Sequence, residues 1–262
     1  MSIVDAIIIA IVEGITEFLP ISSTGHMIIT SSLLGIEKQA FTKLFEVVIQ
    51  LGAILSVVVL YYKKFFNFSR WQFYLRLFIA VIPALVFGAL FSSRIKALME
   101  SNITVGLSLL FGGIILLFVD NIFKNAKLNN DSDITYPKAF AIGLWQVLAM
   151  IPGVSRSAAS IVGGMQQGLS RRLAAEFSFF LAVPTMVAAT GKDLWDWYKE
   201  QGTIASGDLK ILLLGNVIAF VVAIIAIKFF ISYLQKHGFR LFGWYRIIVG
   251  IIVLVLVFSG QL

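Results

Sequence analysis

The strongest structural signal in the chain is the stretch Glu13-Gly14-Ile15-Thr16-Glu17-Phe18-Leu19-Pro20-Ile21-Ser22-Ser23-Thr24-Gly25-His26, which interrupts an apolar region running from Ile3 to Leu34. Proline removes a helix donor and clashes with the preceding turn, and a Ser or Thr just after it can cap a new helix. We therefore predict two short helices joined at the proline, a re-entrant pair, and not one continuous membrane span.

A second apolar region, Ala139–Gly164, is broken in a similar way at Ile151-Pro152-Gly153-Val154-Ser155-Arg156-Ser157. Each break reads Pro-x-x-Ser, and each is followed by an apolar stretch that carries a glutamate, Glu46 or Glu176. The two regions thus resemble a diverged repeat, covering approximately residues 1–118 and 139–262. Three full spans separate the broken regions, so they are predicted to enter from opposite membrane faces, as in an inverted-topology repeat.

The composition places the chain in a membrane. Its 262 residues are 59% hydrophobic and only 13% charged, and the mean hydropathy is +0.92, beyond the range of ordinary soluble domains. Six further stretches approach the length of about 20 helical residues that crosses a bilayer core. We predict an all-α polytopic membrane protein, one integral domain over 1–262, with six transmembrane helices plus the two re-entrant helix pairs. The six spans are Leu44–Tyr62, Phe73–Phe91, Ile103–Phe118, Leu173–Thr190, Leu209–Ile231 and Phe242–Phe258.

The charges indicate an orientation and argue against nucleic acid. The net charge is +7, but the basic residues are scattered between apolar runs instead of forming one stripe. Arg156 aside, one predicted face carries 13 Lys and Arg, Arg246 among them, and the other carries 7. The first should be cytoplasmic, so both termini and the mouth of the first re-entrant pair should face outward. The polar segments Asp120–Lys138 and Lys192–Asp208 are predicted to be connecting loops.

Glu13 and Glu17 are spaced i, i+4, so a helix over Ile8–Phe18 would project both carboxylates from one face. Ionisable groups inside a membrane are usually paired, bound to a metal or directed into a wet cavity, which makes them functional candidates. The alternative is that they are simply solvated near the headgroups. Gln50 is one of several glutamines expected to offer at most a cavity hydrogen bond, and the Gly112-Gly113 and Gly163-Gly164 pairs are expected at helix contacts.

Arg156 lies at the second break, where a planar guanidinium could bind phosphate oxygens bidentately. A salt bridge to Glu13, Glu17 or Glu46 is the alternative, and both could hold in turn. If helices begin at Ser22–Thr24 and at Ser155–Ser157, two positive helix ends point towards the middle of the protein and favour an anion. A carboxylate pair beside a phosphate site implies a bridging divalent cation, Mg²⁺ or Ca²⁺.

Ser23 and His26 lie three residues apart, on one face of a helix that begins at Ser22. A hydroxyl beside an imidazole is an arrangement of nucleophile and base. A histidine inside a membrane is as often a hydrogen-bonding contact between helices. Ser23, His26 and a metal-bound water all remain open as the nucleophile. We favour Ser23, at the start of a half-helix, with His26 taking its proton.

These two motifs, together with Phe45-Glu46-Val47-Val48-Ile49-Gln50-Leu51-Gly52 and Ala175-Glu176-Phe177-Ser178-Phe179 through Pro184, closely resemble the undecaprenyl-diphosphatase family, also called the bacitracin-resistance protein. The resemblance implies divalent-cation-dependent hydrolysis of undecaprenyl diphosphate to the monophosphate and phosphate, at the outer face of the bacterial cytoplasmic membrane. That reaction recycles the carrier lipid of cell-wall synthesis and confers bacitracin resistance.

Carried over position by position, the resemblance implies that Glu13 and Glu17 are the metal-linked acids, Ser23 and His26 the catalytic hydroxyl and imidazole, and Arg156 the phosphate ligand. It adds supporting contacts from Ser22, Thr24 and Ser155. Val154 stands where the family often has Thr, so this chain lacks a hydroxyl there.

A secondary transporter or lipid flippase is the alternative function, because inverted repeats with broken helices also build transporters. A transporter has less need of Ser23 and His26 together. The expected partners are the lipid substrate and membrane lipids. The oligomeric state stays open, with a homodimer among the alternatives.

Overall fold

A computed structural model describes residues 1–99 and 101–262 of the chain. The described residues form helices joined by short connections, and a single isolated bridge between Leu128 and Leu169 is the only β pairing among them. The predicted all-α class is confirmed.

Among the described residues, six helices are long and apolar enough to cross a membrane, which confirms the predicted number of spans. They are α3 Ala40–Leu60, α5 Trp71–Leu90, α7 Asn102–Ile122, α10 Arg171–Gln201, α11 Ser206–His237 and α12 Arg240–Phe258. The short elements between them are α4 Tyr62–Phe65, α6 Ser92–Met99 and the 3₁₀ turns η1 Phe68–Arg70, η2 Asp131–Asp133 and η3 Leu148–Met150.

The two proline-broken regions are helix pairs. The first is α1 Ile3–Thr16 and α2 Ser23–Leu33, and the second is α8 Tyr136–Val147, followed by η3, and α9 Arg156–Gln166. Helix α1 continues in helical geometry as far as Glu17, whose backbone N–H bonds the Glu13 carbonyl at 2.9 Å. The chain then turns through Pro20 before α2. Both predicted interruptions are thus present, whereas entry of each pair from one membrane face and the inverted repeat stay predictions.

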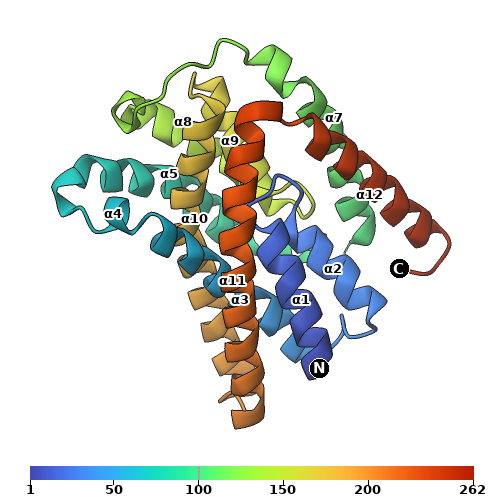
Figure 1. Ribbon diagram of the computed structural model, residues 1–262. Helices are drawn as coiled ribbons and strands as arrows, with labels where there is room; N and C mark the ends of the chain where they lie inside the picture. The colour runs from blue at the N-terminus through green and yellow to red at the C-terminus, as the bar shows by residue number, and fades with distance from the viewer. Residues whose placement is uncertain (100) are drawn as a thin grey trace.

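The long helices pack against the two helix pairs. Helices α10 and α11 run the full height of the molecule, α7 and α12 lie side by side at one edge, and α5 packs along α8 (Figure 1). Helix α1 packs along α11 and also contacts α3. This arrangement holds the break after α1 and the break before α9 inside the helical bundle.

The prediction that Lys192–Asp208 is a connecting loop is wrong, because α10 continues to Gln201 and α11 begins at Ser206. The polar end of α10 is held by contacts one helical turn apart. Lys192 bonds Asp196 at 2.5 Å, and the Lys199 ammonium lies 5.0 Å from the Trp195 ring centre. Such i, i+4 pairs stabilise a helix that has left the apolar layer.

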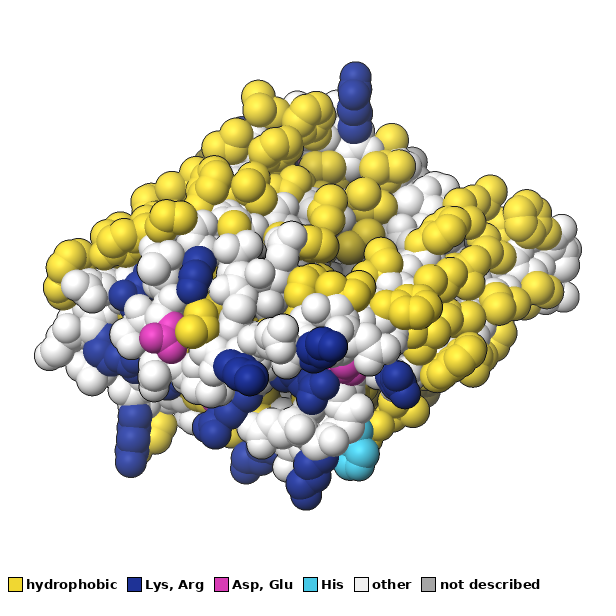
Figure 2. Space-filling view, turned by 90° about the horizontal axis from the view of Figure 1, so that it is seen from above, with side chains coloured by type: hydrophobic (Ala, Val, Ile, Leu, Met, Phe, Trp, Pro, Cys, Tyr) yellow, Lys and Arg dark blue, Asp and Glu magenta, His cyan; other side chains and the backbone are white. Residues whose placement is uncertain are grey.

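Lys and Arg side chains gather on the end of the molecule seen in Figure 2. Here Asp120 of α7 accepts from the Arg171 guanidinium at 2.6 Å and from the Phe239 backbone N–H at 2.8 Å, which joins α7, α10 and the α11–α12 turn. We call this end the basic face. Arg246 is predicted from the sequence to be one of the 13 Lys and Arg residues of this face, but it is fully buried. The other 12 of the 13 remain candidates for the basic face.

The predicted glycine contacts are confirmed as close helix packing. A Cβ atom at Gly113 would lie 2.7 Å from the Gly243 carbonyl oxygen of α12, and one at Gly163 would lie 2.6 Å from the Trp145 ring. Neither position has room for a larger side chain.

Candidate active site

The two breaks meet in the interior of the protein. The Ser157 hydroxyl donates to the Leu19 carbonyl at 2.8 Å, and the Cα atom of Gly153 lies 3.7 Å from where a Cβ of Gly25 would stand. Residues far apart in the sequence, from 17 to 25 and from 151 to 157, therefore form one site.

Each break ends in a serine that caps the following helix. Ser22 accepts from the Gly25 N–H at 3.3 Å and Ser155 from the Ala158 N–H at 3.2 Å. Among the described residues these serines are the two non-glycines with positive φ, 71° and 73°. Such conformations cost about 1–3 kcal/mol each and persist where the surroundings enforce them, often at functional sites.

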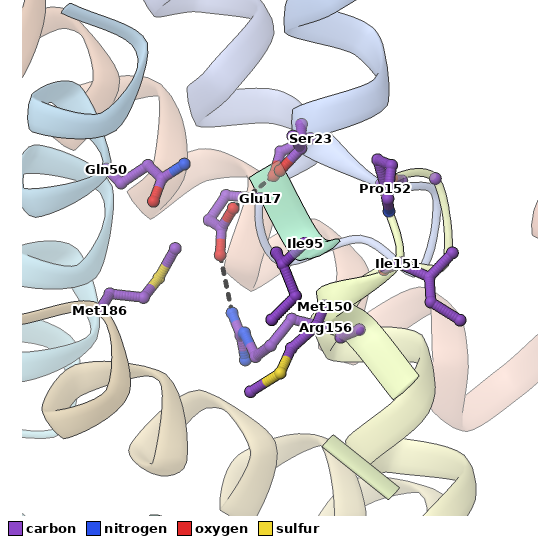
Figure 3. A pocket seen from close by; sticks show the side chains of 14 residues that line it. Glu17, Ser23, Gln50, Ile95, Met150, Ile151, Pro152, Arg156 and Met186 are labelled. Atoms are coloured by element: carbon purple, nitrogen blue, oxygen red, sulfur yellow. Dashed lines mark hydrogen bonds and ion pairs between the residues drawn. The ribbon is translucent and has the colours of Figure 1, made fainter. Parts of the chain in front are cut away.

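Glu17 links the two breaks. Its Oε2 accepts from the Ser23 hydroxyl at 2.5 Å, and its Oε1 accepts from Arg156 Nη2 at 2.8 Å (Figure 3). All three residues are predicted site residues, and the structure brings them together. The predicted alternative of a salt bridge from Arg156 is realised with Glu17.

Arg156 is fixed from its other side by α10. Its Nη1 donates to the Ser178 carbonyl at 2.9 Å and to the Ser178 hydroxyl at 3.2 Å. The Ser160 hydroxyl, one turn further along α9, lies 2.7 Å from that of Ser178. Arg156 Nε is buried and has no partner among the described residues. The guanidinium is thus oriented before any substrate arrives, with its Nε–H still without an acceptor among the described residues.

A cavity of about 180 Å³ opens beside this cluster. Figure 3 shows Glu17 between Ser23 and Arg156, with Gln50 of α3 across the cavity. Both helix N-termini reach the cavity, which fits the prediction of two positive helix ends facing one anion site. One part of its lining is polar, with Ser22, Thr24 and Ser155 beside the cluster, and another is apolar, made by Ile95, Ala149, Met150, Ile151, Pro152 and Met186.

Glu13 lies one turn before Glu17 and is completely buried. Neither of its carboxylate oxygens has a hydrogen-bond partner among the described residues. Two orphaned carboxylate oxygens next to a second carboxylate are the hard oxygen donors that Mg²⁺ and Ca²⁺ prefer, so the pair fits a divalent cation. In the described part of the chain no three His, Cys, Asp or Glu side chains form a metal-binding group.

His26 faces away from Ser23. Its Nδ1 lies 2.7 Å from the Ser22 carbonyl oxygen and its Nε2 lies 2.8 Å from the Tyr245 hydroxyl of α12, and the two rings stack with 5.6 Å between their centres. A carbonyl can only accept, so Nδ1 carries the proton, and in the neutral form of the ring Nε2 accepts from the Tyr245 hydroxyl. In this structure the Ser23 hydroxyl is bonded to Glu17 and not to His26.

Three contributing residues were not predicted. Ser178 lies in the segment that follows Glu176, and the sequence assigns it no role. The one feature that could indicate a role is its small hydroxyl within an apolar span. Tyr245 and Arg246 lie near the start of the last span. From the sequence, Tyr245 is expected to be an aromatic residue at the membrane interface and Arg246 a cation on the surface. Only the packing of α12 against the two breaks reveals their contacts.

Comparison with known proteins gives a consistent result. Residues 6–252 match the family described as bacitracin resistance protein BacA. The chain is 60% identical over 258 residues to an undecaprenyl-diphosphatase of Flavobacterium psychrophilum, covering 98% of this chain and 97% of that protein. It is 52% identical over 263 residues to one of Bdellovibrio bacteriovorus, covering 100% and 98%. With one of Aquifex aeolicus it shares 45% identity over 250 residues, covering 94% and 95%.

Proposed function

The chain belongs to the bacitracin resistance protein BacA family and is an undecaprenyl-diphosphatase, and we propose that it performs the hydrolysis at the Glu17–Ser23–Arg156 cluster. The enzyme dephosphorylates undecaprenyl diphosphate in a membrane. Nothing in the relatives favours the transporter or flippase alternative. The observation that carries the proposed site is the position of Glu17, which contacts both a hydroxyl and a guanidinium at the edge of the cavity.

In the proposed reaction the Ser23 oxygen attacks the terminal phosphorus. The bond between that phosphorus and the bridging oxygen breaks, and undecaprenyl phosphate leaves. Water then cleaves the phosphoserine, which releases inorganic phosphate and restores the hydroxyl. Glu17 accepts the Ser23 proton, since it already holds that hydrogen bond at 2.5 Å. The general-base role expected for His26 thus passes to Glu17, and His26 holds the first turn of α2 through the Ser22 carbonyl.

Arg156 binds the phosphate in this proposal. Its guanidinium leaves Glu17 and donates to two phosphoryl oxygens, as planar forks do with phosphate. The N–H groups at the starts of α2 and α9 supply further donors, with Ser22, Thr24 and Ser155 as supporting contacts. The donors are in place before the charge on the phosphoryl oxygens develops, which is the condition for electrostatic stabilisation of a transition state.

Glu13 and Glu17 are proposed to hold a divalent cation, Mg²⁺ or Ca²⁺, at the two unpartnered Glu13 oxygens. Held by these residues, a cation would supply positive charge that offsets the diphosphate and polarises its phosphoryl oxygens. Glu17 lines the cavity, so the pair lies beside the proposed diphosphate site.

We also propose that the protein lies in the bacterial cytoplasmic membrane with its cavity open to the outer face. The basic face in Figure 2 then lies in the cytoplasm, as the positive-inside rule requires. Arg70, which is paired with Asp131 on the basic side, lies at the start of α5. Helix α6 follows the opposite end of α5, and its residue Ile95 lines the cavity. The cavity is therefore placed towards the side away from the basic face.

Phosphate release by the purified protein in detergent, with and without a chelator, tests the site. Glu17→Gln should lower the rate at least about 100-fold, which is the usual contribution of a positioned base. Glu176→Gln is the matched control, because Glu176 is also buried and ion-paired, to Lys64 and Arg172, away from the cavity. A Glu17→Gln enzyme as active as the control would refute the site, and activity unchanged by the chelator would refute the cation.

A further inference from the structure

Arg246 is a fully buried arginine in the middle of the protein. Its Nη1 donates to the carbonyl oxygens of Pro20 at 3.1 Å and Val154 at 3.0 Å. Its Nη2 and Nε donate to three more backbone carbonyls, those of Gly153 at 2.8 Å, Ser108 at 3.0 Å and Leu109 at 3.5 Å. A guanidinium has five N–H donors, and each finds an acceptor here.

The five carbonyls come from three separate segments. Pro20 belongs to the first break, Gly153 and Val154 belong to the second, and the remaining two lie on α7. A buried cation is costly unless it is fully hydrogen-bonded, so this environment must be assembled around it.

The neighbouring glycines leave room for the guanidinium. A Cβ atom at Gly112 of α7 would lie 2.1 Å from Arg246 Nη2. Gly153 has a φ of 89°, and a Cβ there would lie 2.7 Å from the Val105 carbonyl oxygen. The backbone can therefore approach both the guanidinium and α7 only with glycine at these positions.

The bonded carbonyls lie next to the proposed catalytic groups along the chain. Pro20 stands between Glu17 and Ser23, and Val154 stands two residues before Arg156. We propose that Arg246 is a positioning residue for the hydrolysis: by bonding both breaks at once, it sets the separation between the Glu17–Ser23 pair and Arg156. This inference rests on the site proposed above.

Arg246→Lys keeps the charge but loses the planar fork, and an ammonium cannot reach three segments together. We expect kcat to fall at least about tenfold, because a displacement of about 1 Å at an active site can cost about 100-fold. Gly112→Ala perturbs the same contacts in a second way, because its methyl group displaces the Arg246 guanidinium without removing it. It should also lower kcat.

Gly215→Ala is the matched control for a loss of stability alone. It adds the same methyl group to a different helix contact, between α11 and α3, 2.4 Å from the Phe45 ring, where neither break nor α7 lies. It should lower the melting temperature while leaving kcat within about twofold of the parent, because packing remote from the Arg246 contacts does not move the catalytic groups.

A distance measurement makes the test independent of activity. The chain has no cysteine, so spin labels at Leu33→Cys on α2 and Phe140→Cys on α8, both exposed in the structure, report how the two helix pairs sit. We expect the distance distribution to shift or broaden in Arg246→Lys and Gly112→Ala and to stay unchanged in Gly215→Ala.

An unchanged distribution in both Arg246→Lys and Gly112→Ala, or equal kcat losses in Gly112→Ala and Gly215→Ala, would overturn the positioning role. A displaced pair of labels with normal turnover would instead count against the proposed site, so the two failures are distinguishable.

Discussion

Glu17 and Arg156 are each other's partner in the resting enzyme, and each is also proposed to bind a component of the substrate complex. Their contact at 2.8 Å joins the two broken regions directly. In the proposed reaction the arginine therefore exchanges a carboxylate for a phosphate. Its second anchor at Ser178 keeps the guanidinium plane oriented while that exchange takes place.

Arg156→Lys tests the planar contact. A lysine keeps the charge but cannot bind two phosphoryl oxygens while also bonding Ser178, so kcat/KM should fall at least about tenfold. Steady-state kinetics on the purified variant measure this. Equal catalytic efficiency would reduce Arg156 to a point charge.

The nucleophile is a second question at the level of single residues. We expect a quenched enzyme, turning over substrate labelled in the terminal phosphate, to retain label that survives acid and is lost in alkali, as phosphoserine does. Ser23→Ala should carry none, whereas His26→Ala should still be labelled, since Glu17 and not His26 contacts the hydroxyl.

Label that is labile in acid and absent from His26→Ala would identify the histidine as the nucleophile. Substantial turnover by Ser23→Ala without trapped label would identify water.

At the level of elements, the site depends on where two helices begin. Helices α2 and α9 each follow an N-cap serine with positive φ, Ser22 or Ser155, and the two helix starts face one cavity. The prolines and serines predict these starts, because their local chemistry breaks and restarts a helix. Sequence gives no such signal for Arg246 or Tyr245, since a cation or a tyrosine near the end of a span is ordinary, and their role depends on how α12 packs.

The Ser155 cap can be tested by stability. Ser155→Ala removes the acceptor of the Ala158 N–H and keeps the positive φ of 73°, so it should lower the free energy of unfolding by about 1 kcal/mol. Ser155→Gly also loses the cap, but glycine tolerates this backbone, so its loss should be smaller. Thermal unfolding in detergent compares the two, and a larger loss for glycine would contradict this account.

For the whole molecule, the number of spans follows from composition and length, and the structure agrees. The ends of the spans do not follow from hydropathy alone. Helices α10 and α11 run beyond the apolar layer on charged residues, which hydropathy alone reads as a loop. Which residues face one another across the bundle is a tertiary property, and for that reason the predicted Ser23–His26 pairing differs from the observed Ser23–Glu17 bond.

The orientation can be tested in whole cells. A cysteine at position 38 should react with an impermeant thiol reagent added outside, while one at position 125, on the basic side of the molecule, should not. The chain has no cysteine to interfere. Labelling in the reverse pattern would invert the proposed orientation and place the cavity on the cytoplasmic side.

The salt bridge between Glu17 and Arg156 also affects the release of the product phosphate. After water has cleaved the phosphoserine, the phosphate left on the arginine competes with a carboxylate of the same chain, already within reach at a high effective concentration. At the proposed site, Glu17 thus displaces the phosphate from Arg156. The enzyme should tolerate phosphate in its surroundings with little inhibition and return to the resting pair after every turnover.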